Sequence, residues 1–340
     1  MPDRLAPTRV QSIATGTAFT ANANRTISIV VPCHNEADSL KSFFQATNAA
    51  LQSIPDVSFE LVFIDDGSTD ATLPTLLAFA QADPRMRIIE LSRNFGKEAA
   101  LTAGIDFASG DAVIPMDADL QDPPALIPAL IEKWREGHEV VLAQRVNRDN
   151  DSLLKRVTAH GFYRLHNSLS DHGIPENVGD FRLMDRKVVD ELKRFPERGR
   201  FMKGLFAWVG FRTVTVEYER APRIADVSKF GFWRLWNFAL EGITGFSTLP
   251  LRVWTYAGFT VSLCAFVYGI FMLIRTLLYG NDVPGYASLL VSVMFLGGLQ
   301  LMGLGVIGEY VGRVHQEAKG RPIYIVRQTY RGDDDRNRVA

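Results

Sequence analysis

The chain has 340 residues, with 37 Lys and Arg against 38 Asp and Glu. Its formal net charge of −1 gives no general attraction to nucleic acid, so nucleic acid is not an expected partner. The only two cysteines, Cys33 and Cys264, argue against a disulfide framework and a thiolate metal site. Residues 1–24 lack an apolar core followed by a cleavage site, so we interpret them as a flexible cytosolic tail.

Residues 27–145 alternate short apolar runs with helix-like stretches. The expected strands are 27–33, 59–65, 87–91, 112–116 and 140–143. The expected helices are 40–51, 71–82, 97–108 and 124–135. This alternation predicts an α/β domain built from βαβ units around a parallel sheet. Ligands of such sheets bind beyond the carboxyl ends of the strands, so residues that follow each strand are the first candidates for chemistry.

Two long apolar segments follow, at about 253–278 and 286–309. Each is long enough to cross about 30 Å of hydrocarbon as a helix. Their short connector carries no Lys or Arg, whereas Arg252 precedes the first segment and Arg313 follows the second. This charge bias predicts a multi-pass inner-membrane protein whose catalytic domain and both termini are cytosolic. The alternative, two helices of a soluble core, requires more packing surface than the chain offers.

Residues 229–250 precede the first segment and are rich in aromatic side chains. Arg234, Asn237 and Glu241 share one helical face, while large apolar residues such as Trp233 and Trp236 mostly point elsewhere. The pattern predicts an interfacial amphipathic helix at headgroup depth. A buried amphipathic helix is the alternative.

The densest polar cluster follows the strand 112–116. Asp117, Asp119 and Gln121 offer oxygen ligands of the kind that Mg²⁺ or Mn²⁺ prefers. A cation there would neutralise the diphosphate of a departing nucleotide. A solvated acidic loop is the alternative. Asp65 and Asp66 end another strand and could accept hydrogen bonds from a base and a ribose, although a turn with a helix cap would also explain them.

Taken together, the runs 31–36, 65–70, 93–97 and 117–122 resemble glycosyltransferase family 2. More narrowly, they resemble the polyprenyl-phosphate hexose synthases, which include bactoprenol glucosyltransferases and dolichyl-phosphate mannose synthase. The resemblance extends from Ile27 to Tyr324. It implies a GT-A fold, which is a Rossmann-like mixed sheet, a nucleotide-sugar donor, a divalent cation as cofactor, and inversion at the anomeric carbon.

The resemblance also implies roles for individual residues. Metal and diphosphate would be held by Asp117, Asp119 and Gln121. The nucleoside would be held by Pro32, Asn35, Glu36, Asp65, Asp66 and Lys97. Asp180 lies in a run that matches the segment near the acceptor, where it is a candidate base or sugar-orienting group. With Asp119 and Arg182 it completes the predicted catalytic set.

A lipid phosphate is largely dianionic at neutral pH, so its site needs cations more than a general base. The predicted acceptor site consists of Arg145, Arg200, Arg223, Ser228 and Lys229, with Arg182 also available. Surface salt bridges are the alternative for any one of the arginines. Asp226 stands where the family usually has glycine, and a carboxylate there would repel the phosphate.

These observations predict transfer of a hexose, best matched by glucose from UDP-glucose, to undecaprenyl phosphate for cell-envelope glycan modification. GDP-mannose or a UDP-amino sugar is an alternative donor. A processive polysaccharide synthase is disfavoured, because the chain has neither a multi-helix channel nor a Gln-x-x-Arg-Trp run. A non-catalytic nucleotide-binding membrane scaffold is the second rival, and self-association is left open. The expected domains are the tail 1–24, a catalytic domain 25–228, the interfacial region 229–250, a hairpin 251–312 and a cytosolic tail 313–340.

Overall fold

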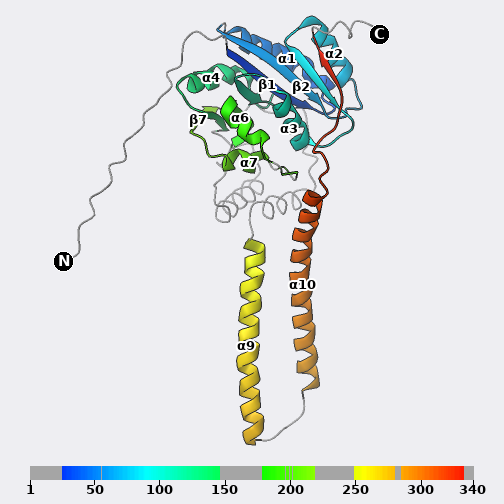
Figure 1. Ribbon diagram of the computed structural model, residues 1–340, viewed down its shortest axis with the longest axis vertical. Coiled ribbons are helices and arrows are strands. Elements are labelled where there is room, and N and C mark those ends of the chain that lie inside the picture. Colours follow the sequence, from blue (N-terminus) through cyan, green and yellow to red (C-terminus); the bar gives the residue numbers. More distant parts are fainter. Residues whose placement is uncertain are drawn as a thin grey trace, which may run out of the picture.

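The computed structural model describes residues 25–54, 56–145, 178–195, 197–198, 200, 202–218, 249–279 and 285–332. A globular α/β domain sits at one end of two long helices, which run away from it as a hairpin (Figure 1). The domain is built on one eight-stranded sheet with the order β7-β5-β6-β4-β1-β2-β3-β8. Predicted acceptor residues Arg223, Ser228 and Lys229, the tail 1–24 and nearly all of the predicted interfacial region lie outside the described residues.

The four central strands are parallel and close to the predicted positions. They are β1 Arg25–Cys33, β2 Val57–Asp65, β3 Met86–Leu91 and β4 Ala112–Pro115. Most of their side chains are buried, as expected of parallel strands covered on both faces. The carboxyl ends of β1, β2 and β4 therefore meet at one edge of the sheet.

Helices cover both faces of this sheet. One face packs against α1 Ala37–Gln52, α2 Thr72–Ala82 and α4 Ile127–Arg135, which follows the short 3₁₀ helix η1 Pro124–Leu126. The other face packs against α3 Lys97–Phe107, α6 Arg186–Lys193 and α7 Met202–Trp208. Residues 68–70 look like caps for the second helix, but α2 begins only at Thr72, and the Asp70 carboxylate accepts the Thr72 N–H at 2.9 Å.

Helix α3 lies very close to the sheet because of a glycine. A Cβ built on Gly104 would stand 2.2 Å from Val30 Cγ1 and 2.6 Å from Ile64 Cδ1. The helix also turns Ala99, Ala100 and other small residues toward the strands. Small side chains on the packed face thus set the depth at which Lys97, the first residue of α3, stands over the edge of the sheet.

Three further strands complete one side of the sheet. These are β5 Val140–Arg145, which the sequence predicts, and β6 Val178–Asp185 and β7 Thr213–Tyr218, which it does not. Strand β6 runs antiparallel to both β4 and β5, whereas β7 is parallel to β5. The antiparallel direction of β6 brings its first residues to the edge where β4 ends.

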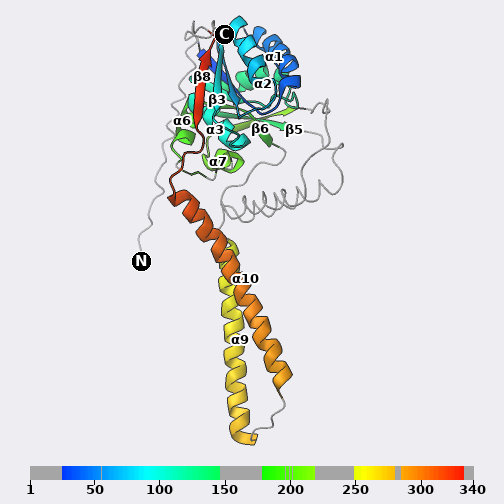
Figure 2. The ribbon, with the colours of Figure 1, turned by 90° about the vertical axis from the view of Figure 1, so that its right-hand side faces the viewer.

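The last strand comes from the segment 313–340, for which the sequence predicts only a cytosolic tail. Strand β8 Val326–Arg331 pairs antiparallel with β3, as Figure 2 shows. Arg327 forms an ion pair with Glu90 at 3.1 Å, and the Tyr330 hydroxyl donates to the same carboxylate at 2.8 Å. Residues 326–331 thus form a strand that the sequence does not predict, because chain beyond the hairpin returns to the domain.

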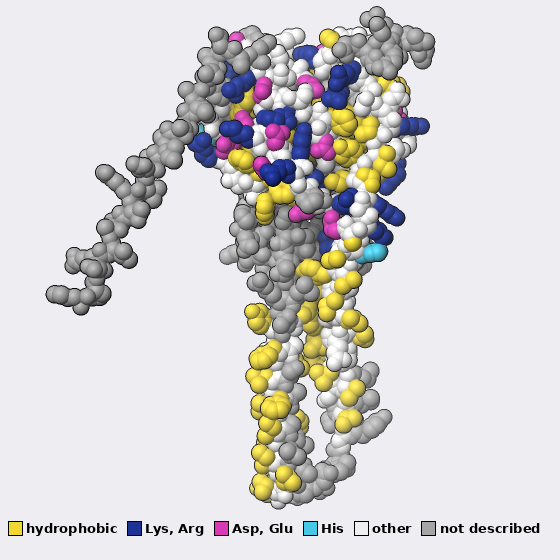
Figure 3. Space-filling view, in the orientation of Figure 1, with side chains coloured by type: hydrophobic (Ala, Val, Ile, Leu, Met, Phe, Trp, Pro, Cys, Tyr) yellow, Lys and Arg dark blue, Asp and Glu magenta, His cyan; other side chains and the backbone are white. Residues whose placement is uncertain are grey.

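The hairpin consists of α9 Leu249–Tyr279 and α10 Tyr286–Ala318. Exposed hydrophobic side chains cover much of its described surface, whereas charged side chains gather on the globular domain (Figure 3). Among the described residues, one segment, Phe295–Ala318, is long and apolar enough to cross a membrane, and a shorter apolar stretch spans Gly258–Tyr268. This segment overlaps the second predicted span over residues 295–309, and a two-span transmembrane hairpin stays a prediction.

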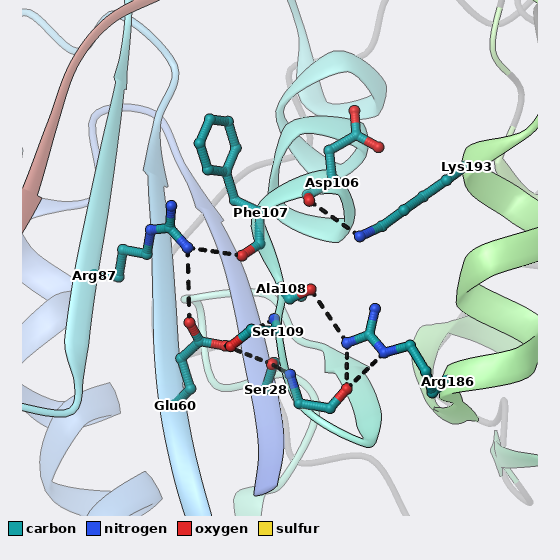
Figure 4. A network of polar contacts seen from close by, with 10 residues as sticks. Ser28, Glu60, Arg87, Asp106, Phe107, Ala108, Ser109, Arg186 and Lys193 are labelled. Atoms are coloured by element: carbon teal, nitrogen blue, oxygen red, sulfur yellow. Dashed lines mark hydrogen bonds and ion pairs between the residues drawn. The ribbon is translucent and has the colours of Figure 1, made fainter.

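A polar network fixes the opposite edge of the sheet, beneath the end of α3 (Figure 4). Glu60 accepts hydrogen bonds from Ser28 at 2.7 Å and from the Ser109 hydroxyl at 2.9 Å. Three cations donate to the last carbonyls of α3 and the residue after it; they are Arg87 to Phe107, Arg186 to Ala108 and Lys193 to Asp106, at 3.0–3.1 Å. Cations at a helix C-terminus complement the helix dipole, so this network fixes the C-terminal end of α3.

Candidate active site at the carboxyl edge of the parallel strands

The centre of the site is Lys97, which bridges two carboxylates from different strands. Its Nζ lies 2.7 Å from an oxygen of Asp117 and 2.9 Å from Asp180. Asp117 follows β4, while Asp180 is near the start of β6. The β4–β6 register pairs Ala112 with Asp185 and Val113 with Met184, so its continuation brings Asp180 level with Asp117.

The charges of this triad are strongly coupled. Burial alone would lower the pKa of Lys97, but the charges of Asp117 and Asp180 outweigh burial and raise it above its usual value. Burial also favours a high pKa for Asp180, yet Lys97 and then Lys203 pull it below the usual value. The pKa of Asp117 is raised, mainly by burial, against the opposing effect of Lys97. Lys97 is therefore charged at neutral pH and offsets part of the negative charge at this edge.

The predicted metal-binding run forms a tight turn after β4. The Asp119 carboxylate accepts the backbone N–H of Gln121 at 3.0 Å, and Leu120 between them has a left-handed φ of 58°. Gln121 is buried. Within the described ranges, no group of three or more His, Cys, Asp or Glu side chains stands close enough to enclose a metal ion.

Asp122 and Arg145 are joined through Tyr218. The Tyr218 hydroxyl donates to Asp122 at 2.7 Å, Arg145 Nε donates to the same hydroxyl at 3.1 Å, and Arg145 stands 3.5 Å from the Asp122 carboxylate. These contacts bind the ends of β5 and β7 to the turn after β4. Arg145 thus lies at the predicted edge, but with its guanidinium already engaged.

Asp65 and Asp66, adjacent in sequence, have different surroundings. Both oxygens of Asp66 are occupied, since they accept the N–H groups of Phe95 at 2.7 Å and Gly96 at 2.9 Å and so shape the loop that begins α3. Asp65 is 2% exposed, and its Oδ1 has no hydrogen-bond partner among the described residues. Burial raises the pKa of Asp65, partly offset by hydrogen bonds from Ser68.

The residues after β1 form the next part of the edge. Pro32 pairs with Ile64 at the end of the β1–β2 ladder. Asn35 has a left-handed φ of 56°, and its side-chain oxygen accepts the Thr69 N–H at 2.8 Å. Burial raises the pKa of Glu36, which Ser39 partly offsets by donating a hydrogen bond at 2.9 Å. Asn35 and Ser39 hold this loop in place, and Glu36 belongs to the same acidic rim.

The structure does not bring Arg200 to this group. Its guanidinium donates to the carbonyls of Phe195 at 2.9 Å and Glu197 at 3.2 Å. Arg200 lies near Asp106. Asp106 is nine residues from Lys97 on α3, so these two residues are roughly 14 Å apart along the helix axis. Arg200 therefore stabilises the loop before α7, and its predicted role in the acceptor site has no geometric support.

Two charged residues near the triad escape the sequence analysis. Glu98 accepts the Met202 N–H at 3.0 Å, and burial followed by the charge of Asp180 raises the pKa of Glu98 to about 7. Lys203, the next residue of α7, is close enough to lower the pKa values of Asp180 and Glu98. The sequence could have pointed to Glu98 because it follows Lys97, and to Lys203 because it lies three residues after Arg200.

Comparisons with known proteins show the family to which the chain belongs. The model of the family Glycosyl transferase family 2 matches residues 28–193, and that of the GtrB C-terminal hairpin matches residues 249–314. The SfII prophage-derived bactoprenol glucosyl transferase of Shigella flexneri is 55% identical over 307 residues, which cover 90% of this chain and 99% of the relative. The bactoprenol glucosyl transferase of Shigella phage SfV is 56% identical, over 88% of this chain and 98% of that protein.

Among solved structures, glucosyl-3-phosphoglycerate synthase from Mycobacterium tuberculosis, in complex with Mg²⁺ and uridine diphosphate, has a TM-score of 0.46. It is 22% identical, with 67% of this chain and 80% of that chain covered, and at this similarity the likeness adds nothing about ligands. The mixed sheet, its acidic edge and the curated relatives define a sugar-transferring enzyme with a Rossmann-like domain. The chain belongs to glycosyltransferase family 2.

Proposed function

We propose that the enzyme transfers glucose from UDP-glucose to a polyprenyl phosphate of the undecaprenyl type, for cell-envelope glycan modification. Relatives that are 55–56% identical along nearly their whole length are named bactoprenol glucosyl transferases, which supports this acceptor and this sugar. The observation that carries the proposal is the bridge from Lys97 to Asp117 and Asp180 at the carboxyl edge of the parallel strands. It gathers an ammonium group and carboxylates that could hold a divalent cation at the place where a diphosphate would leave.

The proposed reaction is a single in-line displacement. An oxygen of the lipid phosphate attacks the anomeric carbon, the bond from that carbon to the diphosphate oxygen breaks, and the diphosphate leaves with the electron pair. A dianionic phosphate has no proton to lose, so Asp180 need not act as a base. In this proposal it holds Lys97 in its charged form and orients the sugar.

Mg²⁺ or Mn²⁺ is the proposed cofactor. Mg²⁺ is usually bound by one or two carboxylates, with substrate phosphates and water as its other ligands. Asp117 and Asp119, with the amide of Gln121, fit that donor set, and a bound cation would favour the charged form of Asp117, whose pKa is raised by burial. The ion would supply charge neutralisation for the leaving diphosphate.

The nucleoside is proposed to lie over the ends of β1 and β2. The buried Oδ1 of Asp65, which has no partner in the part of the chain that the structure describes, is an acceptor that a base N–H would satisfy. Pro32, Asn35 and Glu36 would form the neighbouring wall. Asp66 would act indirectly, because its two oxygens hold the loop that leads to Lys97.

The hairpin α9–α10 is proposed to anchor the enzyme in the inner membrane, with the domain on the cytosolic side. The backbone N–H of Arg198, in the loop before α7, donates to Glu317 near the end of α10 at 2.9 Å. Met202, at the start of α7, is bonded in turn to Glu98 beside the Lys97 triad. These two hydrogen bonds, one from the loop before α7 and one from α7 itself, support an approach of the lipid acceptor from the hairpin side of the domain.

The decisive experiment incubates the purified full chain with Mg²⁺, undecaprenyl phosphate and, separately, UDP-glucose, GDP-mannose and UDP-amino sugars. Mass spectrometry of the lipid should find one added hexose with UDP-glucose, and none after chelation of the metal. The Asp119→Asn variant keeps an acceptor for Gln121 but removes a charge, and it should fold yet lose activity. If a lipid product formed only with another donor, the sugar of that donor would replace glucose in the proposal. The absence of a product with every donor would refute the proposal.

A further inference from the structure

A cavity of about 160 Å³ lies between helix α7 and strands β5, β6 and β7, outside the Lys97 triad. Most of its wall is apolar and includes Leu142, Val178 and Phe206. Two cationic side chains, Arg182 and Lys203, also line it. An apolar cavity that has two cations and, among the described residues that line it, no carboxylate is suited to an anion that carries a hydrophobic substituent.

Arg182 is a buried cation with one unused donor. It is 5% exposed, and its guanidinium carbon lies 4.1 Å from the centre of the Phe206 ring. One terminal nitrogen donates to the Gly179 carbonyl at 2.7 Å, but Nε has no hydrogen-bond partner in the described part of the chain. A buried donor without a partner costs free energy, and a ligand oxygen in the cavity would remove that cost.

The charge of Arg182 is also incompletely balanced. Burial lowers its pKa to about 10, and Asp180 provides the opposing attraction. Asp180, however, is already paired with Lys97 at 2.9 Å. Lys203, the second cation of the cavity, makes no hydrogen bond or ion pair within the described residues, although its charge acts on Asp180.

The cavity lies where a lipid headgroup could arrive. Helix α7, which forms one wall, is at the end of the globular domain nearest the hairpin (Figure 1). Because Asp180 and Arg182 lie two residues apart on β6, both face the α7 side of the sheet. A phosphate held by Arg182 would therefore be next to the carboxylate that is proposed to orient the sugar.

We propose that this cavity binds the phosphate and the first isoprene unit of the acceptor lipid. Arg182 and Lys203 hold the phosphate oxygens, and the apolar wall around Phe206 and Ala207 receives the chain. The volume corresponds to on the order of ten water-sized positions, which matches about ten non-hydrogen atoms in a phosphate and one isoprene unit. This assignment rests on the proposed function for the nature of the acceptor, and it replaces Arg200 with Lys203 as the cation from this part of the chain.

The test measures equilibrium binding of geranyl phosphate to the full chain in detergent, with geraniol and inorganic phosphate as separate arms. Ala207→Phe fills the cavity and Lys203→Gln removes a cation, whereas Lys187→Gln removes an exposed lysine outside it. Both cavity variants should weaken geranyl phosphate binding about tenfold, equivalent to about 1.4 kcal/mol. The control variant should bind like the wild type, and affinity for UDP with Mg²⁺ should be unchanged in all of them.

Unchanged geranyl phosphate affinity in both cavity variants would overturn the assignment. Inorganic phosphate that binds as tightly as geranyl phosphate, or geraniol that does so, would also overturn it, because one half of the ligand would then be irrelevant. If the Ala207→Phe protein unfolds at a lower temperature than the wild type, the affinity of the Lys203→Gln variant alone decides whether the assignment holds. Binding in the cavity without a glycosylated lipid from any donor would refute the proposed function only, whereas product formation with normal binding by the variants would refute the cavity only.

Discussion

Replacing Lys97 with methionine tests whether its charge holds the carboxylates of Asp117 and Asp180 together. Because Nζ lies 2.7 Å from one and 2.9 Å from the other, the two carboxylate oxygens are at most the sum of these distances apart, about 5.6 Å. Two unit charges at that separation repel by about 3 kcal/mol at an effective dielectric constant of 20. The Lys97 side chain is 48% exposed, so solvent screening reduces the expected loss of stability to about 1–2 kcal/mol.

The pH dependence of this loss separates charge from packing. In the native chain Lys97 helps hold the pKa of Asp180 below its usual value, so Asp180 contributes stability that is present at neutral pH and lost on acidification. In the methionine variant the two carboxylates raise each other's pKa, and protonation relieves their repulsion. The difference between the two proteins should therefore be largest near pH 7 and should shrink below about pH 5, toward the unfolded pKa of Asp.

The assay is thermal unfolding of the full chain in detergent, once at pH 7 and once at a pH below about 5. At pH 7 the variant should melt about 2–8 °C below the wild type. Lys187→Met, which removes an exposed lysine, is the matched control and should melt like the wild type. An equal difference at both pH values would mean that packing rather than charge was lost. No difference at pH 7 would mean that the bridge contributes nothing to stability.

Three further outcomes are expected. Gly104→Ala should lower the free energy of unfolding by about 1–3 kcal/mol, because its methyl group has no room against the sheet; Gly297→Ala, which points into open space, should not. Glu98→Gln keeps the acceptor for Met202 but stays neutral, so it should raise the melting temperature at pH 8 and change it little only near pH 4, below the unfolded pKa of Glu, since the pKa of Glu98 is about 7 in the folded chain. Asp226→Gly should raise turnover or lower the apparent KM for the lipid acceptor, and unchanged kinetics would dismiss that carboxylate as a hindrance.

The sequence predicts the part of the fold that depends on local pattern. Strands β1 to β5 and the helices between them stand within a few residues of the expected positions, because each apolar run is bounded by its own turn and helix signals. The acidic edge follows from the same reasoning, since parallel strands end at one side of a sheet. Asp117 and Asp65 are found there for that reason.

What the tertiary structure decided depends on contacts between distant residues. Strand β6 alternates poorly, and only its antiparallel pairing with β4 shows that Asp180 shares Lys97 with Asp117. Strand β8 adds to the sheet after the whole hairpin has intervened. Arg200 and Lys203 are three residues apart, yet the first stabilises a loop and the second lines a cavity beside Asp180. The sequence specifies the chemistry of each side chain. Its partners, however, are set by the packing of helices on the sheet, to which residues far apart in the chain contribute.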